Sequence, residues 1–368
     1  MTSSKALSQI LLPEKNLQLV QMLRGIASVL VILLHITFNS STSFSQPFLF
    51  NIFKFGGAGV DIFFVLSGFI ITYSNLEALS RPNKLIGFLK RRFIRIFPIY
   101  WIVFTFFLLL QLIFSSFYKT PFSLNLTSIL KTWLLLPGHM MINGVSWSLT
   151  NELYFYLLFS LAILIPIKKI VAYFSLGYFI FLIVLAFGGI TSENVYIKLL
   201  IFPMNIEFFL GVLIAIIIKK IPTVLILYML IIGISAFVVG AYYQDNEFVF
   251  LTKGVSEGLN RVVMFGLPSS FIIAAFVKWE LSNTVIVKRF LLQLGDASYA
   301  IYLIHLPIVA ALFKIMVVLH VKNSAIIYIA SIIIIFVVCF LGIIVYKNIE
   351  KPLIKKCNNV FLKSKEIH

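Results

Sequence analysis

Apolar segments of about twenty residues recur along the whole chain, separated by short connections that hold most of the charged residues. A helix of roughly 20 apolar residues is long enough to cross the hydrocarbon core of a membrane. The pattern therefore predicts an all-α, polytopic membrane helix bundle with ten transmembrane helices. The predicted spans are residues 19–39, 58–75, 96–115, 147–166, 170–189, 199–218, 222–241, 262–278, 298–319 and 324–346. Because ten is an even number, we expect both termini on one side.

The distribution of charge predicts the orientation of this bundle. The chain has 30 Lys and Arg against 13 Asp and Glu, which gives a formal net charge of +17. With the N-terminus inside, 21 of the 30 basic residues fall on the inner side and seven in the loops opposite. This bias follows the positive-inside rule, so we predict an N-in, C-in topology. Because the basic residues follow topology, they do not indicate nucleic-acid binding.

Composition supports an integral membrane protein with one domain. The chain is 61% hydrophobic and 12% charged, far from the usual composition of soluble domains. No linker or low-complexity tract divides it, so we expect a single domain over residues 1–368, with the first span retained rather than cleaved as a signal peptide. The two cysteines, Cys339 and Cys357, suggest neither a disulfide framework nor a metal site. The apolar stretch 124–136 is too short to cross and is predicted to be interfacial or re-entrant.

Two ionisable residues lie inside the first predicted span. Arg24 and His35 are eleven residues apart, which places them on nearly the same helix face about 16 Å apart along the axis. Ionisable groups at membrane depth are costly and usually functional. One helix face thus carries polar groups at two depths, as suits a molecule with an anionic part near one surface and a reacting group nearer the other.

A candidate acid–base cluster is predicted in the outer third of the membrane. In the N-in topology, His35 lies near the outer end of its span, and Asp61 and Glu152 lie near the outer starts of theirs. A carboxylate that holds the imidazole in one tautomer would stabilise the imidazolium formed when it accepts a proton. The alternative is a hydrogen-bonded network that only ties helices together.

A second candidate site lies at the inner side. Arg92 and Arg95 are spaced to share a helix face, and such a pair can hold phosphates. Basic clusters at the start of a span are also common as orientation signals and lipid-headgroup anchors. Arg24 favours the phosphate interpretation, because it adds a third guanidinium without an obvious acidic partner in sequence.

Other polar residues lie within the spans. Tyr302 and His305 form a polar stripe with Ser298 in the ninth span. For Glu207 a role in helix pairing is as plausible as a catalytic one. Ser67 has the chemistry of a nucleophile, although a Ser-Gly pair more often marks a close helix contact.

Taken together, these motifs resemble the integral-membrane acyltransferase 3 family, which includes polysaccharide O-acetyltransferases and exopolysaccharide-production proteins. The resemblance covers essentially the whole chain. Its motifs are Leu23-Arg24-Gly25 with His35, Gly59-Val-Asp61-Ile-Phe-Phe-Val-Leu-Ser67-Gly68, Arg91-Arg92-Phe-Ile-Arg95-Ile-Phe-Pro98, Trp147-Ser148-Leu-Thr-Asn-Glu152, Glu207-Phe-Phe-Leu-Gly211 and Tyr302-Leu-Ile-His305-Leu-Pro307. Each motif alone is weak, but six in this order are specific.

The resemblance implies transfer of an acyl group, usually acetyl, from cytoplasmic acyl-CoA to a hydroxyl of a glycan or its lipid-linked precursor in the bacterial inner membrane. It implies acyl-CoA as a co-substrate, no tightly bound cofactor, and membrane lipids and polysaccharide-biosynthesis proteins as partners. Some relatives carry an additional SGNH domain, which we do not expect here. The alternative from another class is a transporter or flippase for a lipid-linked glycan.

The resemblance also assigns roles to residues. His35 would be the principal catalytic residue, either as general base or through a covalent acyl-histidine, with Glu152 and Asp61 in support. The predicted acyl-CoA-binding residues are Arg24, Arg92, Arg95, Tyr302 and His305.

Overall fold

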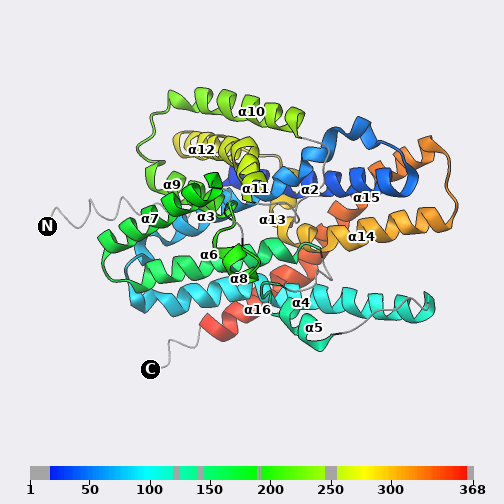
Figure 1. The fold of residues 1–368 in the computed structure, drawn as a ribbon, viewed down its shortest axis with the longest axis horizontal. Coiled ribbons are helices and arrows are strands. Elements are labelled where there is room, and N and C mark those ends of the chain that lie inside the picture. The colour runs from blue at the N-terminus through cyan, green and yellow to red at the C-terminus, as the bar shows by residue number, and fades with distance from the viewer. Residues whose placement is uncertain are drawn as a thin grey trace.

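The computed structural model describes residues 17–118, 125–138, 144–188, 190, 192–244 and 255–362, and within them it contains helices and no strands. Figure 1 shows a helix bundle whose long helices run roughly along one direction. Ten helices in the described residues are long and apolar enough to cross a membrane, and each overlaps one of the ten predicted spans. The predicted all-α, polytopic membrane fold is therefore confirmed, while the N-in, C-in orientation stays a prediction.

The first half of the chain supplies four of the five helices that line the site discussed below. Its helices are α2 (Gln18–Phe44), η1 (Phe48–Gly57), α3 (Ala58–Asn75), η2 (Leu76–Ala78), η3 (Pro82–Lys84), α4 (Leu85–Tyr118), α5 (Leu126–Trp133), α6 (Ser146–Leu164), α7 (Lys168–Phe187) and α8 (Val195–Leu200). Those that line the site are α2, α3, α4 and α6. The second half contains α9 (Asn205–Ile217), α10 (Leu225–Tyr243), α11 (Val255–Arg261), η4 (Val262–Gly266), α12 (Leu267–Ser282), α13 (Arg289–Asp296), α14 (Ser298–Val318), α15 (Ser324–Val345), η5 (Tyr346–Glu350) and α16 (Lys351–Leu362).

Helix α4 differs from its prediction in where it begins. The third span was expected to start at residue 96, but α4 starts at Leu85 and continues through Pro98 to Tyr118. Residues 85–95 contain no proline that would end the helix, and their one glycine, Gly87, lies in its first turn. The basic segment that contains Arg92 and Arg95 is therefore helical, and both side chains face the same cavity.

Two further spans depart from a single straight helix. The sixth span is broken between α8 and α9 around Pro203, since proline cannot donate the backbone hydrogen bond that would continue the helix. The last span does not end at residue 346 but continues through the π-turn η5 into α16. A π-turn adds a residue to the helical turn and often occurs at functional sites. Here it carries the buried Glu350.

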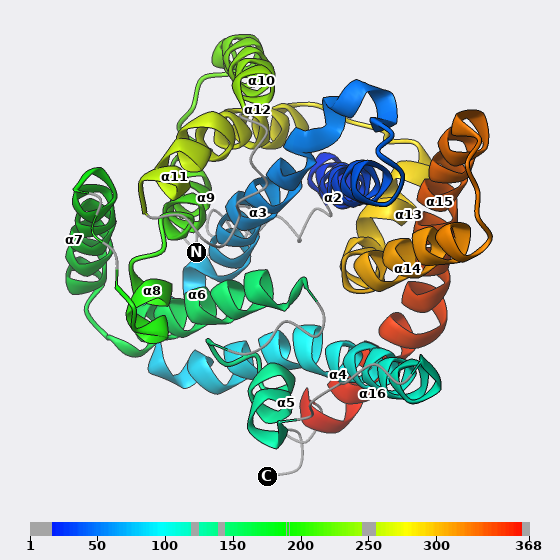
Figure 2. The same cartoon turned by 45° about the vertical axis from the view of Figure 1, so that its right-hand side comes forward.

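The helices divide into an interior group and a peripheral group. Figure 2 shows α3 and α6 towards the centre, with α7 and α10 at the periphery. The apolar part of the second span is 78% buried, whereas that of α7 is 22% buried and that of α10 is 17% buried. Apolar side chains that remain exposed on α7 and α10 suit contact with lipid, because lipid tails are as apolar as these side chains.

Two glycines allow a close helix crossing in the interior. A Cβ atom at Gly68 of α3 would overlap the backbone of Phe208 in α9, and one at Gly211 of α9 would overlap the backbone of Val65 in α3. Small residues at such crossings let helix backbones approach and gain van der Waals contact. This crossing fixes α3, which carries both Ser67 and Asp61, against α9.

Candidate functional site

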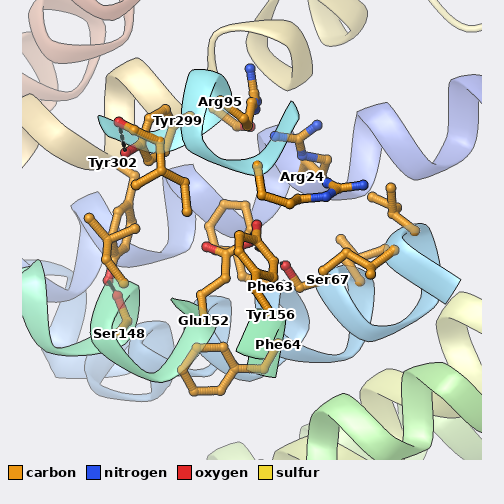
Figure 3. Close-up of a pocket in the computed structure, with 17 residues that line it drawn as sticks. Arg24, Phe63, Phe64, Ser67, Arg95, Ser148, Glu152, Tyr156, Tyr299 and Tyr302 are labelled. Atoms are coloured by element: carbon orange, nitrogen blue, oxygen red, sulfur yellow. Dashed lines mark hydrogen bonds between the residues drawn. The ribbon is translucent and has the colours of Figure 1, made fainter. Parts of the chain in front are cut away.

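A cavity of about 170 Å³ with both polar and apolar side chains in its wall is lined by five helices, α2, α3, α4, α6 and α14. Figure 3 shows the labelled side chains that surround it. The polar residues in its wall are Arg24, Ser67, Arg92, Arg95, Ser148, Glu152, Tyr156, Ser298, Tyr299 and Tyr302. Cationic, carboxylate and hydroxyl groups from distant parts of the chain thus meet around one cavity.

Three arginines line this cavity, and they are held differently. Arg95 forms an ion pair with Glu350, with 2.7 Å between Nη1 and Oε1. The guanidinium of Arg92 lies 5.5 Å from the ring centre of Phe88 and 5.6 Å from that of Tyr156, both cation–π distances. Arg24 donates a hydrogen bond to Gln21. Within the described residues, neither Arg24 nor Arg92 forms an ion pair, so both retain the capacity to bind an anion.

Glu152 is anchored in the cavity through one of its two oxygens. Its Oε1 accepts hydrogen bonds from Ser67 Oγ at 2.6 Å and from Tyr156 Oη at 2.5 Å. No described residue donates to its Oε2. One carboxylate oxygen is therefore held by α3 and α6, and the other remains available to a molecule in the cavity.

Tyr302 joins α14 to α6 in the wall of the cavity. Its hydroxyl lies 2.6 Å from Ser148 Oγ, and its ring packs edge-on against Phe63 with ring centres 5.8 Å apart. Figure 3 shows the Ser148–Tyr302 pair to one side of Glu152 and Ser67. Tyr302 thus separates the cavity from the residues that follow it in α14.

His35 and His305 lie behind Tyr302 and do not line the cavity. Their ring centres are 5.1 Å apart, and the ring of His305 is 5.5 Å from that of Tyr302. His35 is half-buried, and His305 is fully buried. The resemblance placed His305 with acyl-CoA, whereas the structure places it directly beside His35.

Asp61 is bound elsewhere, in a closed cluster of two residues with Arg261; neither carboxylate oxygen of the neighbouring Glu207 has a hydrogen-bond partner among the described residues. Arg261 Nε donates to Asp61 Oδ1 at 2.8 Å, and Arg261 Nη2 donates to Asp61 Oδ2 and to the carbonyl of Gly57. The carboxyl of Glu207 lies next to that of Asp61. All three residues lie outside the lining of the cavity.

The expectation that His35, Asp61 and Glu152 form one cluster at a shared depth is therefore corrected. Gly59 packs against Ala27 and Val31 of the antiparallel α2, so α3 begins one to two turns away from His35 toward the Arg24 end. Hydropathy did not reveal the depth at which α3 begins, because η1 first leads the chain back along α2. In the described residues, His35 forms no hydrogen bond or ion pair with either carboxylate.

Three contributors to these clusters were missed by sequence reasoning. Arg261 was counted as a loop residue, Glu350 as part of the inner tail, and Tyr156 was not considered. The four-residue spacing between Glu152 and Tyr156 on one helix was the signal available for Tyr156. The other two meet their partners across 200 and 255 residues, which no local spacing indicates.

A ten-span helix bundle that encloses a cavity lined by arginine, carboxylate and hydroxyl side chains defines a polytopic membrane protein with an internal polar site. The family follows from comparison of the sequence: a family model described as an acyltransferase domain matches residues 19–345. The chain belongs to this integral-membrane family, acyltransferase 3, and is a membrane acyltransferase. No curated protein and no solved structure matches the chain.

Proposed function

We propose that this protein transfers an acetyl group from cytoplasmic acetyl-CoA to a hydroxyl of a cell-surface glycan, an exopolysaccharide or its lipid-linked precursor. The observation that carries the proposal is the cavity that Arg24 and Arg92 line while neither forms an ion pair within the described residues. Guanidinium groups with free donors bind phosphates strongly and in defined geometry. Acyl-CoA carries such phosphates at one end and a reactive thioester at the other, joined by the pantetheine arm.

The arrangement of the cavity wall supports an acyl-CoA donor. Arg24 and Arg92 line the cavity together with Tyr302, and His305 and His35 lie beyond the ring of Tyr302. Phosphates of CoA bound at the arginines would let the thiol arm extend past Tyr302, so that the acyl group comes near His35.

In the proposed reaction, His35 acts as general base on the acceptor hydroxyl. The hydroxyl oxygen attacks the thioester carbon, the carbon–sulfur bond breaks, and the proton accepted by His35 passes to the leaving thiolate of CoA. Glu152 Oε2 orients the acceptor or the thioester from the cavity wall. Asp61 supports the site indirectly, by fixing the start of α3 through Arg261. No tightly bound cofactor is required.

The proposal includes a setting in the cell. The bacterial inner membrane fits the excess of basic residues in the loops predicted to be cytoplasmic. Partners would be acyl-CoA, membrane lipids, the glycan acceptor and the proteins that synthesise the polysaccharide.

The test is acyl transfer by the purified protein in detergent or lipid nanodiscs. Labelled acetyl-CoA should yield free CoA thiol and a new ester on glycan extracted from a strain that lacks the gene, with the product identified by mass spectrometry. His35→Ala should abolish transfer. A well-folded protein that binds acetyl-CoA but forms no ester with these glycans would overturn the proposed acceptor. Label retained on the protein without acceptor would favour the acyl-histidine route.

A further inference from the structure

The structure places His305, rather than a carboxylate, against His35. Helices α2 and α14 pack side by side in both overall views (Figures 1 and 2). The two imidazole rings lie 5.1 Å apart between centres, tilted by 43°. Each ring nitrogen lies about 1 Å from its ring centre, so small rotations would bring a nitrogen of one ring into hydrogen-bond range of the other.

The hydrogen bonding of His305 fixes which of its nitrogens carries the proton. Its Nδ1 lies 2.7 Å from the backbone carbonyl oxygen of Tyr302. A carbonyl oxygen only accepts hydrogen bonds, so Nδ1 is the protonated donor, and in the neutral ring Nε2 holds a lone pair. The ring is fully buried, and Nε2 has no hydrogen-bond partner among the described residues. A buried acceptor without a partner is costly unless a donor completes it.

We propose that His305 is a positioning residue for His35: Nε2 of His305 accepts the N–H of His35 when the reaction complex forms. This inference rests on the proposed function and assigns to His305 a different role from contact with acyl-CoA. Because one nitrogen of His35 donates its N–H to His305, the lone pair of His35 is on its other nitrogen, which faces the hydroxyl to be deprotonated. His305 thereby takes the role expected of a carboxylate, which was to hold the imidazole of His35 in one tautomer.

The proton balance follows from these two rings. As the hydroxyl oxygen forms its bond to the thioester carbon, its proton moves to the free nitrogen of His35, and the electron pair of the carbon–sulfur bond moves to sulfur. The positive charge on His35 is stabilised by its hydrogen bond to His305 Nε2. The proton then leaves His35 for the CoA thiolate, which restores both neutral rings.

Three variants test this role by kinetics in the acyl-transfer assay. His305→Phe keeps an aromatic ring but removes the acceptor, and we expect kcat to fall about 100-fold with KM for acetyl-CoA unchanged. His305→Gln offers an amide oxygen near the position of Nε2 and should restore kcat to within about tenfold of the native value. In a His35→Ala background, His305→Phe should have no additional effect on the residual rate. His320→Phe, at an exposed position beyond α14, is the matched control.

A second readout does not depend on activity. In ¹⁵N-histidine NMR of the purified protein, His305 should carry its proton on Nδ1, and His35 should be held in one tautomer in the native protein and the Gln variant but not in the Phe variant. A proton on Nε2 of native His305, or a kcat unaffected by His305→Phe, would overturn the inference even if acyl transfer is confirmed. If the native protein transfers no acyl group, the proposed function fails, and the NMR result still decides the pairing.

Discussion

Two groups of charged residues lie inside this bundle, and they differ in whether their hydrogen-bonding capacity is used up. In the Asp61–Arg261 cluster, the guanidinium forks onto both carboxylate oxygens and a backbone carbonyl, and the Asp61 side chain is 0% exposed. In the cavity, Arg24 and Arg92 form no ion pair within the described residues, and Glu152 keeps one oxygen open.

The difference separates structural charge from charge kept for a ligand. Buried pairs that satisfy each other tie helices together, and breaking them is costly mainly because one charge is left behind. Charged groups in a cavity wall whose donors or acceptors are unused can form hydrogen bonds with a substrate. Neither membrane depth nor membership of a family motif distinguishes structural charges from ligand-binding charges, because both groups contain motif residues within the spans.

The largest effect is expected from breaking the closed cluster. Asp61→Ala leaves Arg261 largely buried, with 12% of its side chain exposed, and should destabilise the protein by about 3 to 5 kcal/mol. The measurement is thermal unfolding in detergent with and without acetyl-CoA. Asp61→Ala combined with Arg261→Leu should recover part of that loss, because it removes the uncompensated charge. An Asp61→Ala protein that unfolds normally yet transfers no acyl group would instead place Asp61 in the chemistry.

The next effect distinguishes the two arginines of α4. Arg92→Ala should raise KM for acetyl-CoA about 10- to 100-fold, as expected for a lost charge-assisted hydrogen bond of about 1.5 to 3 kcal/mol, with little change in kcat or melting temperature. Arg95→Ala should also lower the melting temperature, because it leaves Glu350 buried without its ion-pair partner. Binding of acetyl-CoA by calorimetry checks both.

The double variant Arg95→Ala with Glu350→Gln sharpens the contrast. It should restore thermal stability without restoring the affinity for acetyl-CoA, because only the structural part of the Arg95 interaction is repaired. If all these variants bind acetyl-CoA as tightly as the native protein, the arginines act as membrane-orientation signals or lipid-headgroup anchors rather than in CoA binding.

The same contrast shows which parts of the structure the sequence could predict. The ten spans were predictable because bilayer thickness sets their length, and the shared face of Arg92 and Arg95 because helical periodicity sets their spacing. The pairing of Asp61 with Arg261 was not predictable. These helices are apolar on all sides, so hydropathy does not reveal which face meets which neighbour.

The depth of each residue was also only partly predictable. Counting from the start of a span places a residue correctly when the span is one helix that begins at the membrane surface. The position of α3 along α2 and the π-turn at Glu350 depart from that assumption. The first departure moves Asp61 relative to its expected partners, and the second accompanies the pairing of Glu350 with Arg95.

The smallest effect concerns how the open carboxylate of Glu152 is held. Ser67→Ala removes one of the two hydrogen bonds to Oε1, each worth about 1 kcal/mol, so we expect kcat to fall about five- to tenfold while the melting temperature changes little. Ser331→Ala is the matched control, since this buried serine donates only to a carbonyl of its own helix. Tyr156→Phe should have a similar effect on kcat, because its hydroxyl reaches the same oxygen. If Ser67→Ala and Tyr156→Phe both retain full kcat, the orientation of Glu152 does not limit the reaction, and Glu152 belongs with the closed, structural group.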